Sequence, residues 1–219
     1  MEQLEKELAE RVIRELKKAG VEVLEPLKEN RLEVPVSVSA RHVHRSREDM
    51  DRLFGAGSKL TVDRELSQPG QFAAAEKVTV TGPKGEISKV RVLGPLRRQT
   101  QVELAPSDAR RIGVNPPVRP SGSLAGTPGV MLTGPLGSLE LEEGCMIAER
   151  HIHMTCEQAE KRGLKNGQSV QVWIGGPRGG KLLGVRIRVS DDYTYDMHID
   201  TDEANAFQAV PGTRGRMIL

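Results

Sequence analysis

The sequence predicts a mainly β protein, with two pseudo-symmetric β domains and short capping helices following an N-terminal α-helix. Two observations lead to this fold class. From residue 31 onward, short runs with alternating apolar residues are separated by Gly and Pro, which is typical of strands joined by turns in barrels or sandwiches. In addition, the motif Arg-His-x-His occurs at 41–44 and again at 150–153, each time between a predicted strand and a helix cap. The repeat predicts two similar halves with a functional site between them.

Residues 2–19 predict an amphipathic helix. Leucine or valine recurs at every fourth position from Leu4 to Leu16, and Gly20 is a natural stop. The apolar stripe is narrow and the remaining surface is charged. Two roles stay open: packing on the body or on a sister subunit, or an address helix that docks into a groove of another protein. We assign residues 1–30 to this helix and a linker.

The β segments and the helix caps can be placed one by one. The sequence Ser46-Arg47-Glu48-Asp49 resembles a capping box, and Thr155-Cys156-Glu157-Gln158 matches one, so each predicts the start of a short helix. The glycine-rich stretch 175–180 predicts a hairpin loop. The predicted strands are Glu33–Ser39, Lys77–Thr81, Lys89–Leu93, Thr100–Leu104, Gly129–Thr133, Ser169–Ile174 and Leu182–Val189.

Composition excludes several classes of protein. The 219 residues carry a net charge of only +2 with both signs interspersed, which argues against a dedicated nucleic-acid surface. There is no run of eighteen apolar residues, so no membrane span is expected. The acidic start of the chain does not fit a secretory signal, and two cysteines are too few for a disulfide framework. We therefore expect a cytoplasmic protein without nucleic-acid or membrane partners.

The histidines predict a metal site. Residues two apart in a strand point to the same side, so each His-x-His presents two imidazoles to one ion, and a zinc-type site needs three or four ligands. A lone histidine is usually an ordinary surface or core residue, but here every histidine falls in a patterned segment, enough for one or two ions. The five are His42, His44, His151, His153 and His198.

Other polar residues near these motifs are candidates for the same site. Glu103 shares one strand face with Gln99 and Gln101 and offers a carboxylate ligand, although a solvated strand face explains the row equally well. Three arginines near the motifs carry the fork that matches phosphate, although most arginines are surface residues; they are Arg97, Arg98 and Arg188.

The cysteines lie on either side of the second motif. A thiolate ligand or a nucleophile is conceivable for Cys145 and Cys156, but we favour small buried side chains for both.

The chain resembles the phosphate propanoyltransferases of the PduL type, the phosphotransacylases associated with bacterial microcompartments. The resemblance covers about residues 34–207, and no single piece would carry it alone. The matching pieces are Val38–His44, Gln68–Phe72, Gln99–Glu103, Val118–Gly122, Arg150–His153 and His198–Ala206.

The resemblance implies a fold and two metal sites. Both domains would be β-barrels with exchanged strands: residues 31–40 and 149–219 in one, and 41–148 in the other with a small inserted segment near 55–75. Two metal ions, most often zinc, would lie between them. One would be held by His42, His44 and Glu103, the other by His151, His153 and His198.

The resemblance also implies an activity, the interconversion of a short-chain acyl-CoA and inorganic phosphate with an acyl phosphate and CoA. It further implies a homodimer, and it leaves open whether residues 2–19 dock into a microcompartment shell partner, because targeting helices are typically less polar than this one. Gln71 departs from the pattern, which leads us to expect an acidic residue there. The phosphate-side or catalytic positions are Arg97, Arg188, Ser121, Gln68 and Gln101, and the CoA positions are Ser39, Arg91, Leu93, His198 and Asn205.

From these residues we expect phosphate to attack the thioester carbonyl directly, without a protein nucleophile. Two alternatives remain: a binding or scaffold protein whose halves are held together by metal, and a metal-dependent hydrolase that uses water in place of phosphate.

Overall fold

The structure is a computed structural model that describes residues 11–12, 15, 18 and 32–219. The predicted helix over residues 2–19 lies outside the described residues except for four positions, each of which is helical. Contacts divide the chain at Leu32, and the architecture below is that of the unit Glu33–Leu219. Within the described part of the chain, no helix has the length and apolar character needed to cross a membrane.

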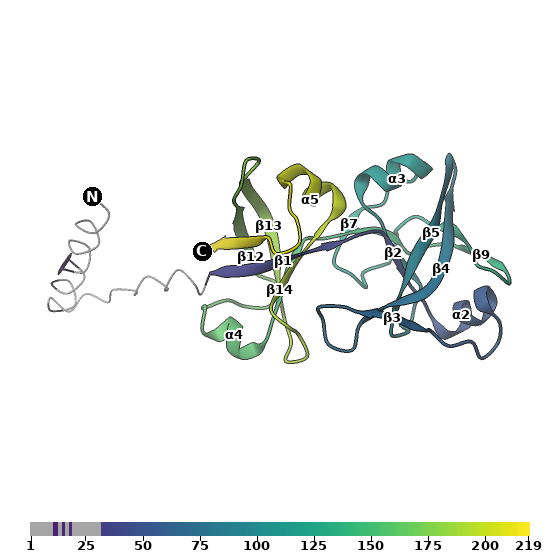
Figure 1. Cartoon of the computed structure of the whole chain (residues 1–219), viewed down its shortest axis with the longest axis horizontal. Coiled ribbons are helices and arrows are strands. Elements are labelled where there is room, and N and C mark those ends of the chain that lie inside the picture. The colour runs from purple at the N-terminus through teal and green to yellow at the C-terminus, as the bar shows by residue number, and fades with distance from the viewer. Residues whose placement is uncertain (1–10, 13–14, 16–17, 19–31) are drawn as a thin grey trace. The chain divides into compact units, whose positions relative to one another are not determined.

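Six strands close into a barrel (Figure 1). Five of them come from the C-terminal third of the chain, and the sixth is the first strand of the unit, which pairs in parallel with β14 and antiparallel with β15. In hydrogen-bonded order they are β1 (Glu33–Ser39), β14 (Asp196–Asp200), β11 (His151–Met154), β13 (Gly180–Val189), β12 (Ser169–Ile174) and β15 (Arg214–Ile218).

The middle of the chain forms a second, 9-stranded sheet that curls into a half-barrel without closing. The prediction of a mainly β fold is thus confirmed, with one closed barrel and one open, curled sheet. Its strands, in order, are β7 (Val118–Arg119), β10 (Cys145–Ala148), β6 (Gln101–Glu103), β2 (His42–His44), β5 (Gly85–Gly94), β4 (Phe72–Gly82), β8 (Val130–Thr133) and β9 (Ser138–Leu141), with β3 (Val62–Glu65) paired to β4.

Four short helices cover the sheets, and the two predicted caps are confirmed. The Ser46 side chain accepts from the Asp49 amide, and Thr155 forms a complete capping box with Gln158. These side chains satisfy amides that a helix start leaves without partners. The helices are α2 (Arg47–Phe54), α3 (Pro106–Ile112), α4 (Cys156–Glu160) and α5 (Thr201–Phe207).

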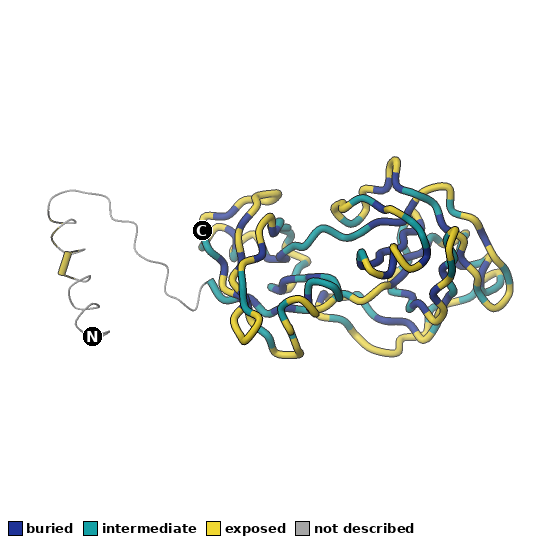
Figure 2. Tube along the Cα trace, turned by 90° about the horizontal axis from the view of Figure 1, so that it is seen from above, coloured by how far each residue is buried: buried dark blue, intermediate teal, exposed yellow. Residues whose placement is uncertain are grey.

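Each sheet encloses its own apolar core, as the buried segments in Figure 2 indicate. The side chains are mostly aliphatic, as expected for a chain with so few aromatic residues, and they alternate along the strands with outward-facing residues. In the barrel the core includes Val34, Val36, Ile152, Val172, Ile174, Val185, Ile187 and Met197; in the second sheet it includes Val43, Val78, Val80, Val92, Val102, Ile112 and Leu132.

The chain passes between the two sheets at both histidine motifs. Ser39 ends β1 in the barrel, and after Ala40-Arg41 the chain enters β2 of the second sheet at His42. It returns after Ala148, where Glu149-Arg150 leads from β10 into β11 at His151. Both His-x-His pairs therefore lie where the sheets meet.

Candidate active site

The two halves of the site occupy equivalent positions in their sheets. On β6, Glu103 is directly opposite His42 in an antiparallel pair, and on β14, His198 is directly opposite His151 in the same kind of pair. Each His-x-His strand thus receives its third candidate ligand from the same register position. In the second half the strand on the other side, β13, is parallel and places Arg188 beside His153.

Details around the motifs repeat as well. The Nδ1 atoms of His42 and His151 lie 2.8 Å from the carbonyl oxygens of Ala40 and Glu149, two residues earlier in each case. An Nδ1–H donated to that carbonyl leaves Nε2 free as a ligand, which is how protein metal sites commonly fix an imidazole.

The motif arginines also act alike. Arg41 pairs with Asp108 of α3 at 3.2 Å, and Arg150 pairs with Glu203 of α5 at 2.7 Å. Each ion pair joins the segment where the chain passes between the sheets to a helix. In each half, this is the helix that follows the strand carrying the third candidate ligand.

His42, His44 and Glu103 form a compact group. All three are buried, and their donor atoms lie within 4.8 Å of one another, a set that could hold a metal ion. Glu103 Oε2 is 3.4 Å from His42 Nε2, and Glu103 Oε1 is 3.9 Å from His44 Nε2. Two imidazole nitrogens and one carboxylate suit zinc and related divalent ions.

His151, His153 and His198 gather their rings with centroids 4.6, 5.2 and 5.0 Å apart. Among the described residues their donor atoms do not converge as closely as those of the first group. His198 Nε2 lies 3.3 Å from Asp196 Oδ2 without hydrogen-bond geometry, and both ring nitrogens of His153 are buried without a partner. Unpartnered buried nitrogens of this kind fit a site whose ligand is a cation.

The electrostatics keep most of these imidazoles neutral. Burial, with the neighbouring His42 and Arg97, holds the pKa of His44 well below 6.5. Burial and His198 lower the pKa of His151 to about 4, and burial and its histidine neighbours lower that of His153 to about 2. A neutral imidazole has the free lone pair that a metal ion requires.

Glu103 stays ionised despite its burial. Burial alone would raise its pKa, but His42, His44 and the hydroxyl of Ser121 hold the pKa of this carboxyl far below its usual range. In turn, Glu103 raises the pKa of His42 against the effect of burial. The first group therefore carries a buried negative charge suited to a cation.

A cavity of about 570 Å³ opens onto both groups. Its walls come from the barrel and from the second sheet, and most predicted site residues line it. Those residues are Ser39, His42, His44, Gln68, Arg91, Leu93, Arg97, Glu103, Ser121, His151, His153, Arg188 and His198.

Two predicted residues do not line this cavity. Asn205 is exposed on α5. Gln101 is buried: its Nε2 donates to Glu103 and, at 2.9 Å, to Ser121, while its Oε1 accepts from the Gly122 amide at 2.9 Å. Gln101 thus orients the Glu103 carboxylate from behind. The alternative of a solvated face is wrong for Gln101 and Glu103, which are only 1% and 7% exposed, but Gln99 of the predicted row is exposed and precedes β6.

Of the two predicted phosphate arginines, Arg97 donates to Ser121 Oγ at 3.0 Å, and Ser121 donates to Glu103 at 2.8 Å. The guanidinium of Arg188 has no hydrogen-bonded partner among the described residues and lies 5.7 Å from the ring centre of Tyr193. Both point a cation into the cavity beside the histidines.

The sequence reasoning missed Tyr193. Its ring lies 4.1 Å from that of His153 and lines the cavity. It stands in the loop before β14 without any motif, and the only available signal was the scarcity of tyrosine, of which the chain has two.

The cysteines lie away from the cavity. Cys145 is fully buried in β10, where burial raises the pKa of its thiol to about 12, and Cys156 is exposed at the start of α4. The preference for a small buried residue is confirmed for Cys145 and wrong for Cys156.

A cavity lined by imidazoles, a buried carboxylate and guanidinium groups is typical of an enzyme. Comparison with known proteins agrees. Residues 35–210 match the family model described as phosphate propanoyltransferase. A phosphate propanoyltransferase of Rhodobacter capsulatus is 54% identical over 174 residues, which are 80% of this chain and 81% of the relative. One of Clostridioides difficile is 44% identical over 218 residues, which are 100% and 99% of the two chains.

The protein is thus an enzyme of the acyltransferase class. It belongs to the phosphate propanoyltransferase family.

Proposed function

We propose that this enzyme transfers a short acyl group, propanoyl or acetyl, between CoA and inorganic phosphate. The relatives are named for the propanoyl reaction. The observation that carries the proposal is the single cavity into which both histidine groups and the guanidinium groups of Arg97 and Arg188 project. A thioester carbonyl oxygen needs a Lewis acid, which an ion held by the histidines would supply, and phosphate needs a cationic partner, which the two arginines supply.

Two divalent ions, most simply zinc, fit the donor sets. His42, His44 and Glu103 would hold one, and His151, His153 and His198 the other. Burial lowers the pKa of His44, His151 and His153, and both buried ring nitrogens of His153 lack a hydrogen-bond partner among the described residues. Such an ion supplies positive charge near a carbonyl oxygen and accepts a thiolate readily.

The chain's own groups then have separable tasks. Arg97 and Arg188 bind phosphate and exclude part of its water, which leaves one phosphate oxygen aimed at the carbonyl carbon. The new C–O bond forms as the C–S bond breaks, and the proton of hydrogen phosphate ends on the CoA thiol. Gln101 and Ser121 keep the Glu103 carboxylate fixed during this exchange.

Transfer is direct in this proposal. Neither Cys145 nor Cys156 lines the cavity, so no thiol is placed to carry the acyl group. Ser121 lines it, but its hydroxyl is hydrogen-bonded within the Arg97–Glu103 chain rather than to an imidazole base.

The test is release of CoA thiol from propanoyl-CoA or acetyl-CoA, measured with and without inorganic phosphate. Phosphate-dependent release with acyl phosphate as product supports the proposal. Release of thiol that does not need phosphate would identify a hydrolase. If protein with bound metal releases no thiol, a binding or scaffold role is the better explanation.

We also retain a division of the chain into residues 1–30, a barrel of 31–40 and 149–219, and a β domain of 41–148 with a small insertion near 55–75. The two sheets support this division. A homodimer, a cytoplasmic or microcompartment location, and docking through residues 2–19 remain hypotheses for a chain of this family.

A further inference from the structure

Gln68 makes two hydrogen bonds to one residue of the opposite half. It lies in the turn between β3 and β4, is 3% exposed, and belongs to the second sheet. Its Nε2 donates to the carbonyl oxygen of Thr194 at 2.9 Å, and its Oε1 accepts from the Thr194 amide at 3.1 Å. One side-chain amide therefore binds the main chain of Thr194 as a neighbouring strand would.

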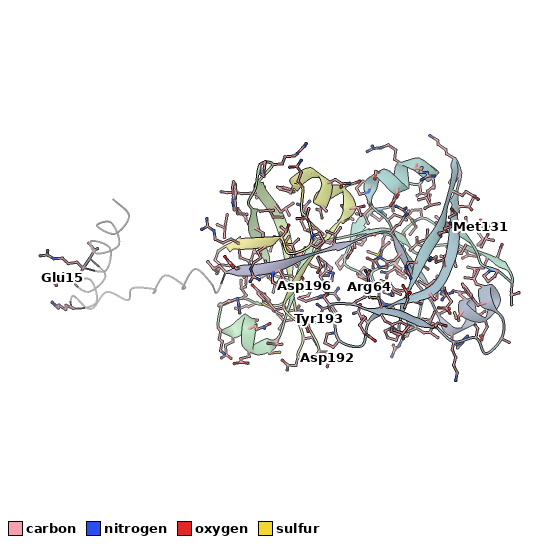
Figure 3. The ribbon with its side chains drawn as sticks, in the orientation of Figure 1. Glu15, Arg64, Met131, Asp192, Tyr193 and Asp196 are labelled. Atoms are coloured by element: carbon pink, nitrogen blue, oxygen red, sulfur yellow. The ribbon has the colours of Figure 1, made fainter. Side chains whose placement is uncertain are left out.

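The segment that Gln68 holds connects two functional strands. It runs from the end of β13, which carries Arg188, to the start of β14, which carries His198. Tyr193 is the residue before Thr194, and its ring lies against the ring of His153 at 4.1 Å and near the guanidinium of Arg188 at 5.7 Å. Figure 3 labels Tyr193 on this loop, where the barrel meets the second sheet.

The Tyr193 amide donates to the Ser190 carbonyl at 3.1 Å, and the contact with Gln68 holds the main chain of Thr194 at the tip of the loop. Its start is fixed on the barrel, where the Ser190 amide donates to Met154 and Asp191 accepts from the Cys156 amide. Thr194 is exposed, so packing does little to hold it. Among the described residues, its main-chain hydrogen bonds go to Gln68.

We propose that Gln68 is a positioning residue, whose amide holds Thr194 so that the Tyr193 ring stays against His153 and near Arg188 as a wall of the substrate cavity. Gln68 then acts on phosphate through Tyr193 and Arg188 rather than by touching phosphate itself. A guanidinium within about 6 Å of an aromatic centre is attracted to the ring, so a fixed Tyr193 limits where Arg188 can point. The catalytic consequence rests on the proposed transfer to phosphate; the contact itself does not.

The first measurement needs no activity. In Gln68→Ala, hydrogen exchange at the Thr194 amide should speed up by about tenfold, the effect of losing a typical hydrogen bond. Gln68→Glu keeps the acceptor but sets a carboxylate against the Thr194 carbonyl, so it should behave like Gln68→Ala. Thr194→Ala is the matched control, because both bonds go to its main chain and exchange there should stay slow. Unchanged exchange in Gln68→Ala would overturn the proposal.

The second measurement is a double-mutant cycle on the Michaelis constant for phosphate. Gln68→Ala and Tyr193→Ala should each raise this constant by about tenfold. The double variant should be no worse than Tyr193→Ala alone, because one residue acts through the other. The Michaelis constant for acyl-CoA should change by less than about twofold, since the contact serves the phosphate side.

If the double variant raises the Michaelis constant for phosphate by the product of the two single effects, Gln68 acts independently of Tyr193 and binds substrate directly, and the proposal fails. Asp192→Asn, an exposed change in the same loop, controls for general loosening and should leave both constants unchanged. If the unaltered enzyme shows no phosphate-dependent activity, the proposed function fails instead, and the exchange experiment still decides whether Gln68 holds the loop.

Discussion

Replacing either of two arginines on one strand should have different effects, one on activity and the other on stability. Arg186 and Arg188 are neighbours on the same face of β13, beside His151 and His153. Arg186 is committed within the protein: it pairs with Glu149 at 2.9 Å and donates to the Gly167 carbonyl at 2.8 Å. Arg188 has no such ion pair or hydrogen bond among the described residues, and it lines the cavity.

The expected magnitudes follow from these partners. Replacing Arg188 with Ala removes the proposed charged contact to phosphate, and such a contact is worth about 1.5–3 kcal/mol, so the Michaelis constant for phosphate should rise by about 10- to 100-fold. Because Arg188 leaves no buried carboxylate without a partner, the melting temperature should stay within about 2 °C. Arg186→Ala breaks a solvent-screened pair with Glu149, which should lower the melting temperature by no more than about 2–4 °C at this chain length.

The assay is thiol release at saturating acyl-CoA with phosphate varied, together with thermal unfolding of both variants. Arg186→Ala should keep its Michaelis constant for phosphate within about twofold. The reasoning is refuted if the two variants lose activity alike, or if Arg188→Ala alters only the Michaelis constant for acyl-CoA.

Three further predictions concern the histidines and the cysteines. His44→Ala or His151→Ala should each remove about one metal ion per chain and most activity, as measured by elemental analysis and thiol release; unchanged metal content would refute the ligand assignment. Thiol reagents should modify Cys156 but not Cys145 in the folded enzyme, and Cys156→Ala should retain turnover; an acyl group trapped on either cysteine would contradict direct transfer. Because the folded state keeps the Cys145 proton that the unfolded chain loses near pH 9.0, stability should fall with rising pH above that value, and Cys145→Ala should reduce the slope in urea unfolding curves.

Much of the fold could be predicted because its signals are local. Strands β1 and β12 have the predicted bounds, since alternation sets them directly. The predicted strand at Lys89–Leu93 was too short: β5 begins at Gly85, and Lys89, with a φ of 58°, breaks the alternation without ending the strand. Backbone irregularity of this kind leaves no mark in a residue pattern.

In the site, too, some features could be predicted from the sequence and others could not. The histidine groups could be predicted from the sequence, because the motif is repeated and because side chains two apart in a strand point to the same side. The interactions that cross between the sheets could not be predicted, because they depend on which loops meet. Gln68 and Thr194 are 126 residues apart, and nothing near either one indicates the other.

The crossing of the chain at each histidine motif affects how the enzyme is made. Because β1 pairs with β14 and β15, it can complete its pairing only after those two strands have been synthesised. The Ser37 hydroxyl likewise donates a hydrogen bond to Asp196, 159 residues later in the chain. Contacts this distant in sequence slow folding. All strands of the second sheet, with His42, His44 and Glu103, are synthesised before His198. The residues proposed to hold the first ion are therefore all synthesised before those proposed to hold the second, whose site can form only as the barrel closes.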